Sequence, residues 1–137
     1  MKRIIAILIA TIMILSVVSC SKNQPEDINQ LIIGEWVRSY TATKDDVFKY
    51  YRKGDKLLEV LIIRKGGSGE KYTILERDRN NRDERFDLWS FEWSLEDYCI
   101  TTHSEFMGIS KYSTYTVDLA KKMLHEAESG FEYQKVE

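Results

Sequence analysis

The chain has 137 residues, with 20 Lys and Arg against 22 Asp and Glu, which gives a formal net charge of −2. This mild acidity argues against a nucleic-acid-binding protein, because such proteins usually carry a basic face. Apolar residues make up 43% of the chain and aromatic residues 12%, which favours a folded domain over a disordered one.

The first twenty residues have the pattern of a secretory leader. Residues 2–3 are Lys-Arg, and residues 4–18 are almost wholly apolar. This run is too short to cross a bilayer core of roughly 30 Å comfortably. It ends at residues 17–20, Val-Val-Ser-Cys, which resemble the lipobox of bacterial lipoprotein signal peptides. The resemblance implies that residues 1–19 are removed and that Cys20 carries the membrane-anchoring acyl chains, such as palmitate; an ordinary signal peptide or an uncleaved anchor is the alternative.

The residues after the lipobox predict where the protein is held. Ser21 follows the cysteine, whereas in lipoproteins of this kind an aspartate there often signals retention in the inner membrane. The resemblance therefore implies a cell-envelope protein held by lipid at the outer membrane. Residues 20–30 are polar and predict a lipidated tether, so we expect the folded domain to span residues 31–137.

After the tether, short runs rich in β-branched and aromatic residues alternate with turn signals. About eight strands are predicted, at residues 32–41, 56–64, 70–77, 85–95, 98–103, 111–119, 123–126 and 131–136. The charged segment 44–53 fits either a short helix or a strand with a loop. Short links imply antiparallel neighbours. The predicted fold is therefore an all-β meander that closes into a barrel, with a β-sandwich as the alternative.

Five aromatic residues are candidates for a ligand pocket. Trp89, Phe91 and Trp93 alternate with polar residues along one predicted strand, so they share one face that should point inward. Tyr115 and Tyr133 lie on inward faces of later strands. These side chains either form the core or line a pocket for a small apolar ligand.

The start of the predicted domain carries a family motif. Gly34-Glu35-Trp36, followed by a meander of strands, resembles the lipocalin family, and more closely the compact lipocalin-like domains of bacterial lipoproteins. The resemblance implies that Gly34 permits a tight bend and that Trp36 caps one end of a barrel. In lipocalins a basic residue of the last strand often packs on this Trp. Here the last strand, residues 131–136, offers Lys135 and no Arg.

The sequence shows no catalytic constellation. It has two histidines, His103 and His125, without a ligand pattern around them, so we expect no metal, no cofactor and no enzymatic activity. If Cys20 is lipidated, Cys99 has no disulfide partner, and we expect it to be a small buried hydrophobe. The mixed-charge run 77–85 is either a solvated hairpin tip or a loop that contacts a protein or glycan.

These observations lead to two functional hypotheses. The first is a membrane-anchored, non-enzymatic binding protein for a small apolar ligand, which follows from the inward aromatic residues. The second is a structural or protein-interaction subunit of an envelope complex. The membrane is the one partner that both share, through the lipid anchor.

Overall fold

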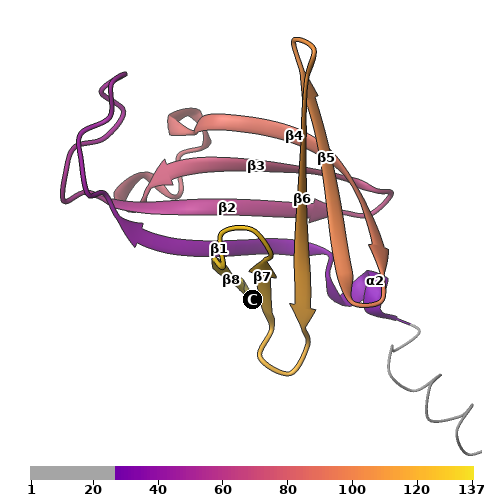
Figure 1. Cartoon of the computed structure of the whole chain (residues 1–137). Helices are drawn as coiled ribbons and strands as arrows, with labels where there is room; N and C mark the ends of the chain where they lie inside the picture. The colour runs from indigo at the N-terminus through magenta and orange to yellow at the C-terminus, as the bar shows by residue number, and fades with distance from the viewer. Residues whose placement is uncertain (1–26) are drawn as a thin grey trace, which may run out of the picture.

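A computed structural model describes residues 27–137, in which a closed antiparallel barrel is formed (Figure 1). The leader, Cys20 and most of the predicted tether lie outside these residues. The helical elements are α2 (Ile28–Leu31), η1 (Glu76–Asp78) and η2 (Arg82–Glu84). The strands are β1 (Gly34–Thr41), β2 (Lys56–Arg64), β3 (Ser68–Leu75), β4 (Phe86–Glu96), β5 (Cys99–Phe106), β6 (Ile109–Asp118), β7 (Met123–Glu126) and β8 (Glu132–Lys135).

Each strand pairs with its neighbours in chain order, and β8 pairs with β1 to close the ring. The prediction of an all-β meander of eight strands in a barrel is confirmed, and the β-sandwich is not formed. The segment 44–53 is neither helix nor strand and belongs to the loop between β1 and β2. No helix within residues 27–137 has the length and apolarity needed to span a bilayer.

Two boundaries differ from the sequence-based expectation. The strands on either side of residues 107–108 are longer than predicted, because Met107 and Gly108 both have positive φ, 50° and 80°, and make a tight turn. Pairing therefore continues to Phe106 and Ile109. The folded part also begins before residue 31, since Ile28 opens α2 and is only 1% exposed.

The main core lies inside the barrel. Strand alternation turns Leu61 and Ile63 of β2 inward, where they join the main apolar cluster. The opposite face of β2 and β3 carries a separate buried cluster that includes Val60 and Tyr72. Within the described residues, the buried hydrophobic side chains extend from Ile28 to Tyr133.

One end of the barrel is closed by α2 and Trp36. The Trp36 side chain is 1% exposed, and its Nε1 donates a hydrogen bond to the Ile32 carbonyl at 3.0 Å. Lys135 of β8 places its Nζ 5.8 Å from the centre of the Trp36 ring and donates to the Leu31 carbonyl. Gly34 has φ 137°, and a Cβ there would lie 3.3 Å from the Lys135 side chain. A lysine of the last strand thus packs against Trp36.

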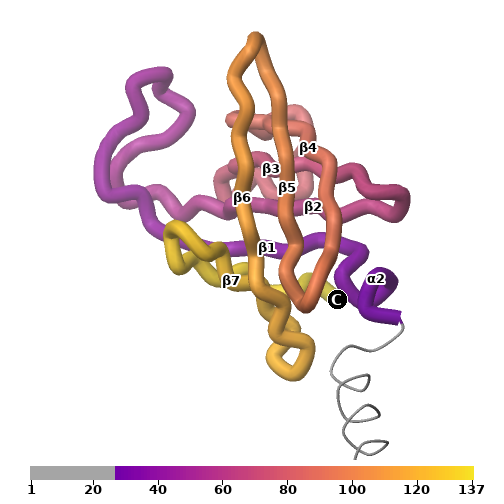
Figure 2. The backbone as a smooth tube through the Cα atoms, turned by 45° about the vertical axis from the view of Figure 1, so that its right-hand side comes forward, coloured from indigo at the N-terminus to yellow at the C-terminus, as the bar shows by residue number. Residues whose placement is uncertain are grey.

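The opposite end of the barrel is formed by the longer loops. It carries the β1–β2 loop, the two turns η1 and η2, and the tip of the β5–β6 hairpin. Figure 2 shows that this hairpin projects beyond the other strands, away from α2. The two ends therefore differ: one is capped by packed side chains, and the other bears projecting segments.

Candidate functional site

A charged network occupies part of the barrel interior. Glu59 of β2 is its centre: its Oε1 lies 2.7 Å from Lys71 Nζ and accepts a hydrogen bond from the Tyr133 hydroxyl at 2.8 Å. Its Oε2 lies 2.5 Å from a guanidinium nitrogen of Arg38. Glu126 Oε2 lies 3.6 Å from Lys71 Nζ and 3.4 Å from the Tyr133 hydroxyl. Five side chains from five strands are thus connected by hydrogen bonds and ion pairs.

The network keeps its charges at neutral pH. Burial opposes ionisation of Glu59, but hydrogen bonds from Lys71, Arg38 and Tyr133 outweigh it, so the pKa of Glu59 lies below its ordinary value. Burial also opposes the charge of Lys71, but Tyr115 and the carboxylates of Glu59 and Glu126 outweigh it and raise the pKa of Lys71. Burial, together with the nearby Glu59 charge, raises the pKa of Tyr133 far above its ordinary value. The network thus pairs two carboxylates with two basic side chains inside the barrel.

A small cavity lies inside the barrel. Its volume is about 20 Å³, and its lining includes Phe91, Tyr115, Thr102 and Ser104. A cavity of this size holds about one water molecule. This cavity is therefore too small for an apolar ligand.

The five predicted aromatic residues take different positions. Phe91, Tyr115 and Tyr133 are buried in the core, and the two tyrosine rings meet edge to face at 5.8 Å. Trp89 is half-buried at the projecting end, where its ring contacts Phe106 edge to face at 5.9 Å. Trp93 lies at the other end of β4 and faces a pocket. The structure does not gather the five side chains into one site.

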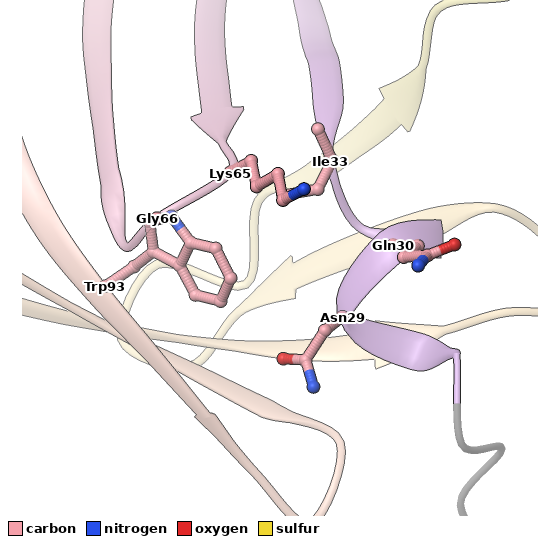
Figure 3. A pocket seen from close by; sticks show the side chains of 6 residues that line it. All are labelled: Asn29, Gln30, Ile33, Lys65, Gly66 and Trp93. Carbon is pink, nitrogen blue, oxygen red and sulfur yellow. The ribbon is translucent and has the colours of Figure 1, made fainter.

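A second pocket lies beside Trp93, outside the barrel interior and next to α2. Its volume is about 540 Å³, within the usual range for small-molecule sites. Figure 3 shows the indole ring on one side of the pocket and α2 on the other. The pocket is lined by Asn29, Gln30, Ile33, Lys65, Gly66 and Trp93.

The Trp93 ring is held in a fixed orientation. Its Nε1 donates to the carbonyl oxygens of Arg64 and Ser68, both at 3.0 Å, and its backbone N–H donates to the Gly67 carbonyl at 2.8 Å. These bonds tie the ring to the β2–β3 turn. The polar edge of the indole is thereby satisfied, and an apolar ring face remains for the pocket.

The chemistry of the lining suits an amphiphilic anion. Ile33 and Trp93 supply apolar surface, while the exposed Asn29 and Gln30 supply amides. Lys65 is the one charged residue of the lining, and within residues 27–137 no carboxylate lies in ion-pair distance of it. An ammonium without a counter-ion attracts a carboxylate or phosphate group.

Sequence reasoning singled out Trp93 and missed the rest of this lining. The sequence places residues 29–30 in the predicted tether and gives no indication of a site at Lys65 or Gly66. One signal for α2 was available: Ile28, Leu31 and Ile32 have the i, i+3, i+4 spacing of a helical turn. No local sequence signal places Lys65 next to that turn, because their proximity follows from the register in which β1 pairs with β2, with Gly34 opposite Ile63.

The other candidate residues form no reactive group. Within the described residues no cluster of three or more His, Cys, Asp or Glu side chains could hold a metal. His103 stacks on Tyr112 at 4.4 Å, and His125 Nδ1 lies 3.4 Å from Glu132. Cys99 is a free thiol and is only partly buried, so the expectation of a buried residue is wrong; it precedes the inward-facing Ile100 and therefore faces outward.

No family model, curated protein or solved structure matches this chain. The class of protein therefore follows from the fold: a small antiparallel meander barrel of eight strands, consistent with a lipocalin-like fold. Its candidate site is the pocket beside Trp93.

Proposed function

We propose that the chain is a lipid-anchored lipoprotein of the cell envelope, held at the outer membrane, whose lipocalin-like barrel binds a small amphiphilic molecule without enzymatic activity. The lipobox at residues 17–20 and Ser21 support the anchor and its membrane. The Gly34-Glu35-Trp36 motif and the barrel support the lipocalin-like character. The ligand site that we propose is the pocket beside Trp93.

One observation carries the choice of site: the pocket beside Trp93 measures about 540 Å³, whereas the cavity inside the barrel that Phe91 and Tyr115 line measures about 20 Å³. A ligand of moderate size fits the first and not the second. The apolar part of the ligand would lie against Trp93 and Ile33, and its anionic group would meet Lys65. This places the ligand at the closed end of the barrel, beside the start of the folded chain.

Decanoate is a suitable probe, because it combines an apolar chain with a carboxylate. The domain of residues 21–137 would be titrated with decanoate and with the uncharged decanol, followed by tryptophan fluorescence and thermal unfolding. We expect decanoate to change the fluorescence and to raise the unfolding temperature. Lys65→Gln should weaken decanoate binding about tenfold and leave decanol binding unchanged.

Two further variants identify the tryptophan that causes the fluorescence change. Trp93→Phe should remove the fluorescence change, whereas the matched variant Trp89→Phe, at the projecting end, should keep it. Absence of binding by both compounds, or equal loss in the two tryptophan variants, would contradict the proposed site.

A further inference from the structure

The β5–β6 hairpin has an outer half whose backbone pairs with no other strand. β5 pairs with β4 only from Cys99 to His103, and β6 pairs with β7 only from Tyr115 to Asp118. The cause is the length of β7, which has 4 residues against 10 in β6. Residues 104–114 therefore form a two-stranded ribbon that extends past the barrel wall (Figures 1 and 2).

This ribbon exposes apolar side chains as well as backbone. Phe106, Met107, Ile109 and Tyr112 are 59%, 86%, 63% and 61% exposed. Over residues 109–113, the side of β6 that faces away from β5 has no neighbouring strand in the described part of the chain. An isolated two-stranded ribbon is marginally stable in water, and a third strand stabilises it. The free edge is thus a place where a strand can be added.

The backbone argues against a lipid bilayer as the occupant of this edge. Hydrocarbon would cover Met107 and Ile109, but it offers no hydrogen-bond partner to the unpaired N–H and C=O groups of β6. An added strand satisfies both the apolar side chains and the backbone groups.

The charge of Lys111 argues against a second copy of the chain. In a two-fold pairing of two β6 edges centred on Ser110, Lys111 or Tyr112, the two copies of Lys111 lie directly or diagonally opposite each other, and like charges in such positions destabilise a sheet. Lys111 makes no ion pair within residues 27–137, and its Nζ lies 5.7 Å from the centre of the Trp89 ring. A carboxylate from a different chain would complement it.

We propose that the free edge of β6, residues 109–113, binds an extended segment of another protein as an added β-strand, with an acidic side chain of that segment opposite Lys111. The added strand continues the line of β7 where β7 ends, so it extends the sheet beyond the closed part of the barrel. This site is separate from the pocket beside Trp93 and does not rest on the ligand proposed there.

Three fluorescent eight-residue peptides test this proposal against the domain of residues 21–137. The first peptide alternates valine and glutamate, the second replaces glutamate by lysine, and the third is the first peptide methylated on alternate backbone nitrogens. We expect the first to bind in a polarisation assay, and the other two to bind at least about tenfold more weakly. Binding should also slow hydrogen exchange of the backbone amides at residues 109–113.

Protein variants distinguish binding at the β6 edge from non-specific binding to exposed apolar side chains. The double variant Ile109→Ser, Tyr112→Ser should weaken binding of the first peptide about tenfold. Lys111→Gln should reduce the preference for glutamate over lysine. The control is Val47→Ser, Phe48→Ser, which removes two still more exposed apolar side chains from the β1–β2 loop and should have no effect.

Several results would overturn the proposal. The first is that the valine–glutamate peptide does not bind at about 1 mM. The second is that the methylated peptide binds as tightly as the unmethylated one. The third is that the Val47→Ser, Phe48→Ser control loses as much peptide affinity as the Ile109→Ser, Tyr112→Ser variant. If the domain sediments as a dimer and the Ile109→Ser, Tyr112→Ser variant sediments as a monomer, the edge would be assigned to a second copy of the chain. Binding to phosphatidylcholine–phosphatidylglycerol vesicles that depends on Tyr112 would assign it to a membrane.

Discussion

Replacement of Glu59 by glutamine tests whether the interior network stabilises the barrel. The Glu59 side chain is 13% exposed and contacts Arg38, Lys71 and the Tyr133 hydroxyl. Removing one partner of a buried ion pair costs about 3 to 5 kcal/mol. Lys71 keeps Glu126 at 3.6 Å, whereas Arg38 contacts no other carboxylate in the described residues. We therefore expect the lower end of this range, about 3 kcal/mol.

The direction in which pH changes the stability difference between the wild-type domain and Glu59→Gln follows from the pKa of Glu59. Because the pKa of Glu59 is lowered in the folded state, its contribution is present above the ordinary value of 4.5 and is lost as the pH falls through the folded-state pKa. The stability difference between the wild-type domain and Glu59→Gln should therefore be constant near neutral pH. It should shrink as the pH falls below 4.5.

Urea unfolding between about pH 3 and pH 7 measures both quantities. The control is Glu137→Gln, which removes an ion pair with Lys122 at the surface, where the two side chains are 68% and 57% exposed. Its free energy of unfolding should not change measurably. A loss below about 1 kcal/mol for Glu59→Gln, or a difference that stays constant into acid, would refute the reasoning.

Three further changes test the packing and the anchor. Gly69→Ala should cost about 2 to 3 kcal/mol in urea unfolding, because a Cβ there would lie 2.4 Å from the Ile62 carbonyl oxygen and from the Phe91 ring. Trp36→Phe should cost about 2 kcal/mol in the same assay, since it removes a buried indole hydrogen bond and leaves a void. Cys20→Ser should move the protein out of the membrane fraction on cell fractionation; a cleaved variant that stays in the membrane would contradict lipid anchoring.

The strands could be predicted from the sequence because their signals are local. The apolar run at residues 56–64 and the short strand at 123–126 match β2 and β7. The alternation from Trp89 onward correctly turned Phe91 inward. The extension of β5 and β6 was missed, because it depends on positive φ at Met107, a residue that seldom adopts it.

The interior network and the pocket could not be predicted in the same way. Tyr133 and Glu59 are 74 residues apart, so their hydrogen bond exists only after the barrel has closed. Glu59 also interrupts an apolar run, where a charge is expected to face solvent. The pocket likewise joins α2, the β2–β3 turn and Trp93 of β4. Local patterns indicate which face of a strand is buried, but not which distant residues meet there.

The two proposed surfaces lie at opposite ends of the barrel, which makes them independent. Six residues separate Cys20 from Asp27, and an extended chain from one to the other spans at most about 25 Å. Under the proposed anchor, the pocket beside α2 therefore lies near the membrane, and the β5–β6 ribbon points away from it. Trp93→Phe should then leave peptide binding at β6 unchanged, and the Ile109, Tyr112 double variant should leave decanoate binding unchanged. A loss of both activities in either variant would mean that the substitution disturbs the whole barrel rather than one surface.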